Sequence, residues 1–478
     1  MRSHRALLAA VGLVFFGQGC GQASDAKDTD DGGRAGSVNT MVGAGAGGGS
    51  SVAGLSEHGG SVGTQPGEGG HASSANAGSG GLGASATATG GGTATAGSAT
   101  GGTSAGGHPA GGAAPAAAGV SGAGFGGTAP GGAGGALNMD GPCPVPSYIA
   151  SDPKPIGWAS QGSATTGGGN ATPILVTTLA QFKTEVSGTN AKVIYVKGEF
   201  ASDSITLGSN KTIIGCSSQA KLQGHLGIGS STSNVIIRNL RISGYGVGDC
   251  AKDPSFDPGT GCSSGSDAIS VNGSAHHVWI DHCLIMDGTD GNLDITNNAD
   301  FVTVSWTKFA YTPRTDAVGD DSTGAAGHRF SNLVGGSDSA PSGWPNTRPL
   351  NVTWHHDWWA DGVVERQPRV RYGQNHLFNN YYDSTASNYC VRAGIEASIL
   401  LEGNDFEGVK SPHQFNNADN EKTAYIALGT GDRANRYTSV SGDQEKDGGG
   451  SPFTPPYSYQ VSAASGVAAA VKAGAGPH

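Results

Sequence analysis

Short apolar runs of β type recur in the second half of the chain, and their spacing limits the possible folds more than any other feature. The runs show little helical periodicity and begin at Asn234, His277, Phe301, Asn351, Asn375 and Ser398. The steps between these starts are 43, 24, 50, 24 and 23 residues, so two steps are close to twice the others. A repeat near 23 residues is typical of a parallel β-helix, in which stacked coils bury one continuous apolar column.

Asparagines support this all-β prediction. Asn239, Asn379, Asn380 and Asn404 occupy turn-like positions, where stacked side-chain amides can hydrogen-bond from coil to coil, so we interpret them as structural. A β-sandwich or a propeller is the competing fold. A propeller needs four strands in roughly every 40–50 residues together with blade motifs, and the sequence has no such motif.

The chain divides by composition into three parts. Residues 1–20 have the pattern of a signal peptide, because two arginines precede an apolar run from Ala6 to Phe16 that is too short to span a bilayer comfortably. Residues 21–140 are mostly Gly, Ala, Ser and Thr and cannot bury enough apolar area to offset the cost of ordering, so we expect a disordered linker. Residues 141–478 then form a single β-helix domain, large enough for a full core.

These features predict an exported protein, secreted or held at the cell surface, and a monomer. Cys20 follows Gly17-Gln18-Gly19, which resembles a bacterial lipoprotein signal, although Gly17 stands where a Leu is usual, so plain secretion stays open. A lipid on Cys20 is the only membrane link that we expect. The net charge of −11 speaks against nucleic acid as a partner but is compatible with an acidic substrate if cations and local arginines mediate the contact.

The other six cysteines are an even number, which permits disulfides in an oxidising compartment. Cys250 and Cys262 bracket a polar loop and are the pair that we predict first. Cys216 and Cys283 lie in apolar strand contexts, where buried free thiols are an equally good interpretation.

The repeat also predicts a cluster of carboxylates. Asp267 and Asp290 are 23 positions apart, Asp290 and Arg314 are 24 apart, and Arg314 and Arg366 are 52 apart, near two coils plus a loop. Asp294 follows Asp290 by four residues, so the strand period of two returns it to the same side. Three carboxylates on adjacent coils offer the hard oxygens that Ca²⁺ prefers and leave room for water and substrate oxygens. Taken singly, each aspartate is better explained as an ordinary turn residue, and it is the coil-spaced column that favours a metal site.

Arginines follow this column. The stretch ERQPRVRYG, residues 365–373, contains R-x-P-x-x-R, formed by Arg366, Pro368 and Arg371. Pro368 fixes its own φ and restricts Gln367, which would hold Arg366 in a set direction. Arginines beside an open Ca²⁺ site predict a substrate that bears carboxylates. A basic strand edge that prevents aggregation is the alternative.

Together these stretches resemble the pectate lyase family, polysaccharide lyase family 1. The matching segments run in family order across about two-thirds of the chain, from residue 155 to residue 476. They are GWAS (157–160), TTGG (165–168), SNKTIIG (209–215), NVIIRNLRI (234–242), SDAISVNGS (266–274), HVWIDHC (277–283), DGNLDI (290–295), VTVSWTKF (302–309), RQPRVRYGQNHLFNNYY (366–382) and SPFTPPYSY (451–459).

The resemblance implies a right-handed single-stranded parallel β-helix. It implies calcium-assisted β-elimination of de-esterified polygalacturonate to 4,5-unsaturated oligogalacturonates. It implies Ca²⁺ ligands at Asp267, Asp290 and Asp294, the Brønsted base at Arg366 and substrate carboxylate binding at Arg371.

Two positions depart from the family pattern. Arg314 stands at or near a position where many members have a substrate-binding Lys, and we expect it to bind substrate instead. Gly265 stands where a further acidic ligand is common, so a fourth carboxylate for the metal is in doubt. Because a free guanidinium loses its proton only above about pH 12, we expect Ca²⁺, Arg371 and Arg314 to lower the pKa of Arg366, which predicts an alkaline pH optimum.

Other functions remain open. A pectin lyase that acts on methyl-esterified polymer would need no Ca²⁺, and Trp354, Trp358 and Trp359 would then line an apolar cleft, although they are expected to pack in the coil. A non-catalytic pectin-binding surface protein would keep the cleft charges without needing Arg366.

The histidine pairs do not indicate a catalytic dyad or a zinc site. The resemblance assigns the neighbouring Asp281 and His282 to a strand signature, and strand alternation predicts that they face opposite ways. The pairs His276-His277 and His355-His356 lack zinc-site spacing, and alternation predicts that the members of each pair also point apart.

Overall fold

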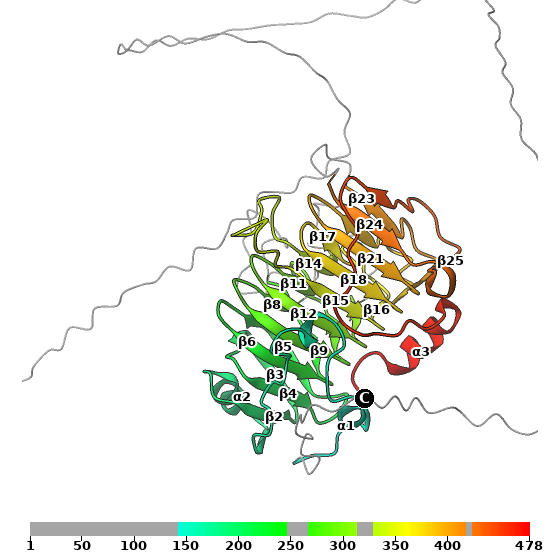
Figure 1. Ribbon diagram of the computed structural model, residues 1–478. Coiled ribbons are helices and arrows are strands. Elements are labelled where there is room, and N and C mark those ends of the chain that lie inside the picture. Colours follow the sequence, from blue (N-terminus) through cyan, green and yellow to red (C-terminus); the bar gives the residue numbers. More distant parts are fainter. Residues whose placement is uncertain (1–141, 246–265, 313–327, 417–422) are drawn as a thin grey trace, which may run out of the picture. The chain divides into compact units, whose positions relative to one another are not determined.

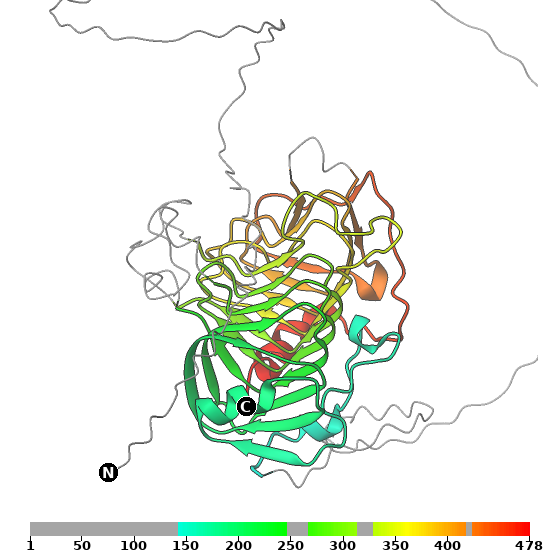
Figure 2. The ribbon, with the colours of Figure 1, turned by 90° about the vertical axis from the view of Figure 1, so that its left-hand side faces the viewer.

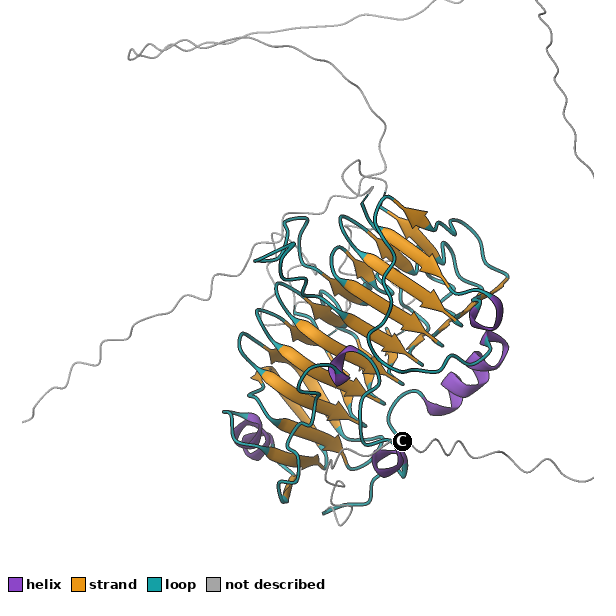
Figure 3. Cartoon of the chain, viewed as in Figure 1, coloured by secondary structure: helices purple, strands orange, loops and turns teal. Residues whose placement is uncertain are grey.

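The computed structural model describes residues 142–245, 266–312, 328–416 and 423–478. This part of the chain winds into successive coils of short strands that stack into a right-handed parallel β-helix (Figures 1 and 3). All the strand pairs of the described residues are parallel except β24 with β26. The predicted fold is therefore confirmed.

The strands form two sheets. The first sheet has eleven strands in chain order: β1 (Pro173–Val176), β2 (Lys192–Val196), β4 (Lys211–Gly215), β6 (Ser233–Arg238), β9 (His276–Asp281), β12 (Asp300–Ser305), β15 (Val352–His355), β18 (Gln374–Phe378), β21 (Ser398–Glu402), β24 (Tyr425–Leu428) and β26 (Asp447–Gly448).

The second sheet has two branches, because the long strand β5 (Lys221–Ile228) pairs with β3 (Glu199–Thr206) and then with the first strand of each branch. One branch contains β7 (Arg241–Ser243), β10 (Leu284–Met286), β13 (Lys308–Ala310), β16 (Trp358–Trp359), β19 (Tyr381–Tyr382), β22 (Asp405–Glu407) and β25 (Arg436–Thr438). The other contains β8 (Ile269–Val271), β11 (Leu293–Ile295), β14 (Asn332–Val334), β17 (Arg369–Val370), β20 (Val391–Ala393) and β23 (His413–Phe415).

Each predicted apolar run holds two of these strands joined by a tight turn; the run at His277, for example, spans β9 and β10. The two long steps of 43 and 50 residues are not double coils, as the spacing indicated. β6 pairs directly with β9, and β12 pairs directly with β15, so each long step is one coil enlarged by loops.

Alternation within the strands builds the core. Inward side chains of the first sheet stack in register from coil to coil, and all of them are fully buried: Ile237, Ile280, Val304, Trp354, Leu377 and Leu401. Phe309, Trp359, Tyr382, Phe406 and Tyr437 stack ring on ring along the next branch. Trp354 and Trp359 therefore belong to the core and do not line a cleft.

The predicted asparagine ladder is present. Asn404 Oδ1 accepts hydrogen bonds from the backbone N–H and the amide of Asn380, at 3.0 Å each. Asn435 continues the ladder on the next coil by accepting from Asn404. Asn239 follows β6 and Asn379 follows β18, and each donates to a glycine carbonyl of an adjacent coil.

Helices and terminal segments cover the coils. α2 (Leu179–Val186) begins at Thr178, whose side chain accepts from the backbone of Gln181, and it buries Phe182 and Val186 at the first coils. The other helices are α1 (Tyr148–Ser151), α3 (Val467–Gly474) and the 3₁₀ turns η1 (Trp158–Ser160), η6 (Gly431–Arg433) and η7 (Ala464–Gly466). α3, red in Figure 2, packs on Trp358 and Tyr381. None of the described helices has the length and apolarity needed to cross a membrane.

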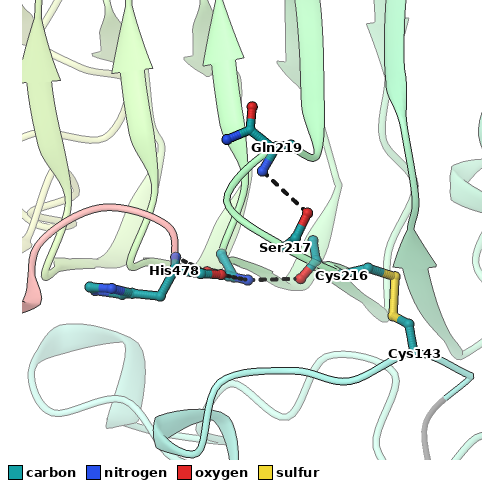
Figure 4. Close-up of a disulfide and its surroundings, with 7 residues drawn as sticks. Cys143, Cys216, Ser217, Gln219 and His478 are labelled. Carbon is teal, nitrogen blue, oxygen red and sulfur yellow. Dashed lines mark hydrogen bonds between the residues drawn. A yellow bond between two sulfur atoms is a disulfide. The ribbon is translucent and has the colours of Figure 1, made fainter.

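One disulfide joins Cys143, before α1, to Cys216 at the end of β4 (Figure 4). Of the two interpretations of Cys216 and Cys283, the disulfide holds for Cys216 and the buried free thiol for Cys283. The predicted Cys250–Cys262 pair lies outside the described residues, as do the signal segment, Cys20 and the linker.

Candidate active site

The outward side chains of the β8–β23 branch form the surface on which the predicted site lies. Register places one outward residue of each strand in a row: Ser270, Asp294, Leu333, Arg369 and Arg392. Asp267, Asp290 and Arg366 each precede a strand of this branch by two or three residues, so the coils bring them to the same edge. Three of the predicted residues thus lie along one edge of the stack, on the coils of β8, β11 and β17.

Two of the carboxylates converge beside Gly291. A side chain at Gly291 would begin only 2.9 Å from Asp267 Oδ1 and 3.0 Å from Asp294 Oδ1, so the aspartate oxygens occupy the space next to this glycine. Asp294 is nearly buried, and its Oδ1 also accepts from the backbone N–H of Leu333 at 3.1 Å. The predicted proximity of Asp267 and Asp294 is therefore observed.

The third carboxylate has a histidine partner that the sequence did not reveal. Asp290 Oδ1 lies 3.0 Å from His328 Nε2. The His328 ring is nearly buried and lies 4.1 Å, centroid to centroid, from the ring of Phe330. His328 stands outside any recognisable motif, and only the coil geometry brings it to Asp290.

The pKa of a buried tyrosine, Tyr311, reports the negative charge of the acidic group. Burial and the negative charges of four aspartates raise the pKa of Tyr311 well above its ordinary value; the four are Asp287, Asp267, Asp290 and Asp294. The hydroxyl of Tyr311 donates to the carbonyl of Phe330 at 2.6 Å. The four carboxylates therefore lie within electrostatic reach of one buried hydroxyl at this edge. No group of three or more His, Cys, Asp or Glu side chains within the described ranges is already arranged around a metal position.

Arg366 lies in a turn with φ of +59° before β17, and it is half-buried. Its guanidinium carbon lies 4.5 Å from the centroid of the Phe330 ring. Desolvation works to lower the pKa of Arg366, but negative charge on Tyr389, Asp294 and Asp290 outweighs it and raises the pKa. The lowering of this pKa that we expect from Ca²⁺, Arg371 and Arg314 stays a prediction, because Arg314 lies outside the described residues.

Arg371 is already engaged within the protein. Its Nε donates to Asp338 Oδ1 at 2.9 Å, and its Nη1 donates to the carbonyl of Gly335 at 2.8 Å. The hydroxyl of Tyr372 holds the backbone of Asp338. Asp338 is 58% exposed, so this ion pair lies at the rim of the site. Arg314 and Gly265 lie outside the described residues.

The Asp281–His282 pair is structural, as expected, but the geometric reason was wrong. His282 has φ of +48° because it sits in the turn after β9, and its Nδ1 lies 2.8 Å from Asp281 Oδ2. Arg238 Nε donates to the same oxygen at 2.7 Å, and Ser305 donates to Oδ1. Burial opposes the charged form, yet Arg238 and His282 hold the pKa of Asp281 down to about 2.

The other histidine pairs depart from strand alternation for the same reason. His277 and His356 both have positive φ. In each pair the two Nδ1 atoms approach each other, at 2.7 Å for His276 with His277 and 3.0 Å for His355 with His356. Burial lowers the pKa of His356 to about 4, so this ring stays neutral near neutral pH.

Comparison with known proteins identifies the fold and the family. The family profile described as pectate lyase matches residues 147–477. Pectate lyase A of Dickeya chrysanthemi is 32% identical over 296 residues, which are 52% of this chain and 70% of that protein. Pectate lyase A of Aspergillus niger is 31% identical over 330 residues, 67% of this chain and 87% of that protein. Pectate trisaccharide-lyase of Thermotoga maritima is 30% identical and covers 52% and 60%.

Solved structures agree on the fold. A pectate lyase structure determined for substrate specificity and the anti β-elimination mechanism has a TM-score of 0.51 and 22% identity, covering 67% of this chain and 96% of that one. The fold and these relatives define an enzyme, a polysaccharide lyase of the parallel β-helix class. The chain belongs to the pectate lyase family, and pectate lyase activity is the function that the relatives support.

Proposed function

We propose that this protein cleaves de-esterified polygalacturonate by calcium-assisted β-elimination, with Arg366 as the base. The observation that carries the proposal is the convergence of Asp267 and Asp294 beside Gly291, with Arg366 within electrostatic reach of Asp290 and Asp294. Relatives that are named pectate lyases support the substrate class.

The donor set fits a calcium ion. Asp267 and Asp294 direct oxygens to one space that no side chain fills, and Asp290 lies next to Gly291 in the same turn. Carboxylate oxygens are the ligands that Ca²⁺ prefers, and three of them leave positions for water and for substrate. When bound there, calcium would supply positive charge that neutralises the carboxylate of the substrate next to the acidic C5–H.

Arg366 would remove the C5 proton. The C5–H electron pair forms the C4–C5 double bond, the C4–O bond to the next sugar breaks, and the leaving oxygen takes a proton from water. Arg366 must be neutral to accept the proton, and the negative charges of Asp290 and Asp294 oppose this because they raise its pKa. Once their charges are balanced, these residues no longer favour the protonated guanidinium, and an alkaline pH optimum is expected.

Arg371 and Arg314 would bind substrate carboxylates. Arg371 points its guanidinium to an exposed carboxylate, Asp338, so it is already oriented for an anionic group at the rim. A bidentate guanidinium suits a carboxylate of the polymer. The family resemblance, which aligns Arg314 at or near a substrate-binding lysine, supports the same role.

The alternative of a pectin lyase is less well supported. Trp354 and Trp359 are fully buried, and Trp358 packs under α3. The described face instead carries carboxylates and arginines, which suit an ionised polymer.

The test is the ultraviolet absorbance of the new C4–C5 double bond on adding the protein to polygalacturonate at alkaline pH, with Ca²⁺ and then with excess EDTA. A rise that EDTA abolishes is expected. A rise that resists EDTA would point to a pectin-lyase-like site, and no rise from folded protein would favour a non-catalytic pectin-binding protein.

We also propose that the protein is exported, acts as a monomer, and is secreted or held at the cell surface by a lipid on Cys20. The signal-like segment and the arginines before it support export. Mass spectrometry of the protein from its native host tests this: a mature chain that begins at Cys20 with an acyl mass is expected, and a chain without lipid would support secretion.

A further inference from the structure

The ring of Phe330 faces the guanidinium of Arg366, and the coil register explains why. Phe330 forms an isolated parallel bridge with Glu365, the residue before Arg366. The backbone N–H of Asn332 donates to the carbonyl of Arg366 at 2.6 Å, which continues the same pairing. Two coils are therefore locked so that the Phe330 side chain lies beside Arg366, with 4.5 Å between the guanidinium carbon and the ring centroid.

Phe330 is itself held at its backbone and at its ring. Tyr311 binds the Phe330 carbonyl through its hydroxyl, and the His328 ring packs against the Phe330 ring. His328 in turn contacts Asp290. Phe330 is only 6% exposed, so its ring has little freedom to turn. The contact thus connects Arg366 to the acidic group through packed side chains.

An arginine that packs on an aromatic ring is held in a different geometry from an arginine that pairs with a carboxylate. Asp281 binds the N–H edge of Arg238, which keeps that arginine charged and engaged. A ring face contacts the guanidinium plane and leaves its N–H edge uncommitted. In keeping with this, Arg366 Nε is buried and has no hydrogen-bond partner within the described parts of the chain. Such an arrangement positions the group without blocking the atoms that exchange protons.

We propose that Phe330 is a positioning residue for Arg366, holding the guanidinium by its face so that its edge is directed to substrate. This inference rests on the proposed function, in which Arg366 is the base. Because the effect acts on the reacting group and not on substrate binding, loss of the ring lowers kcat and leaves KM almost unchanged.

The test compares Phe330→Leu with Phe330→Tyr in the full chain, using initial rates on polygalacturonate with Ca²⁺ and thermal unfolding. Losing the cation–π contact is expected to lower kcat about 3- to 30-fold. Tyr keeps the aromatic face and is expected to restore kcat to near the wild-type value. The matched control is Phe309→Leu, because Phe309 is equally buried but stacks on Trp359 in the core. It should lower the melting temperature without changing kcat.

Two results overturn the inference. One is a Phe330→Leu enzyme with wild-type kcat, and the other is equal loss of kcat in the Leu and Tyr variants. If the Leu variant does not fold, Phe330→Met, which conserves volume without a ring, takes its place in the same comparison. The proposed function fails separately, by retained activity in Arg366→Ala, so the two failures are distinguishable.

Discussion

Two groups of arginine and aspartate lie on the same stack of coils and have opposite character. Arg238 and Asp281 stand opposite each other in the register of β6 and β9, fully buried and hydrogen-bonded. Arg366 lies near Asp290 and Asp294 but stacks on Phe330. In the first group the arginine and the aspartate form an ion pair with each other. In the second group the carboxylates lie close to one another.

The difference separates structural charges from those that we propose to be functional. In a buried ion pair, the attraction between the two charges offsets part of the cost of desolvating them. Such a pair does not need a further ligand. Converging carboxylates are costly without a cation, and proteins retain such costs at functional sites. The arrangement of partners distinguishes the two groups, since the residue types are the same.

The largest expected effect is on catalysis. Arg366→Ala removes the proposed base, so kcat should fall roughly 10²- to 10⁴-fold. The melting temperature should stay within a few degrees, because no hydrogen bond to Arg366 Nε is lost. Steady-state rates and thermal unfolding check this. Activity near the wild-type value would remove Arg366 from the mechanism.

The matching change in the other group should affect stability instead. Asp281→Asn leaves Arg238 buried without its counter-charge, so the free energy of unfolding should fall by roughly 3–5 kcal/mol. kcat of the folded fraction should not change. Denaturant unfolding measures this, with the exposed Asp432→Asn as the control that should not differ from wild type. A stable Asp281→Asn protein with reduced kcat would reverse our assignment of the two groups.

Another buried carboxylate, that of Asp357, lies beside the asparagine ladder and extends the comparison. Its Oδ1 accepts from the backbone of Thr307, while Oδ2 is buried without a partner within the described residues. Burial raises the pKa of Asp357 well above its ordinary value. The folded state therefore keeps a proton that the unfolded state loses above about pH 4, and stability falls as pH rises from there through the folded pKa.

Asp357→Asn removes the titrating carboxyl group and therefore the loss of stability at high pH. An amide can donate to a carbonyl there as Asn380 donates to Trp354, so stability should rise by roughly 1–3 kcal/mol at alkaline pH and by less near about pH 5. Melting temperatures of both proteins at the two pH values test it. The reverse change, Asn380→Asp, should lower stability most at high pH. A gain for Asp357→Asn that is the same at both pH values would show that Asp357 does not titrate as described.

The smallest effect is expected at the rim. Asp338→Asn frees Arg371 from an exposed ion pair worth at most about 1 kcal/mol, so KM for polygalacturonate should fall by up to about five-fold with kcat unchanged. Glu396→Gln is the control, since its side chain binds Trp344 and the change removes the same charge. A rise in KM would mean that Asp338 orients Arg371 for the substrate.

The fold was predictable because the apolar runs and the asparagines repeat with the coil. The two long steps between apolar runs wrongly suggested double coils. Each is a single coil with a loop insertion, between β6 and β9 and between β12 and β15. Strand alternation failed at His282, because positive φ in the turn brings its ring back to Asp281. His328, Phe330 and Asp338 lay outside every motif, so sequence spacing had no means of finding them.

The sequence by itself determined a parallel β-helix and the family, and it predicted which carboxylates and arginines form the site. It could do so because strand period and coil length are local properties that repeat. Only the tertiary structure decided which charges are matched: Asp281 meets Arg238, Arg371 meets Asp338, and Arg366 meets a ring. Those pairings depend on where separate coils bring their turns together, and residue spacing alone does not specify that distance.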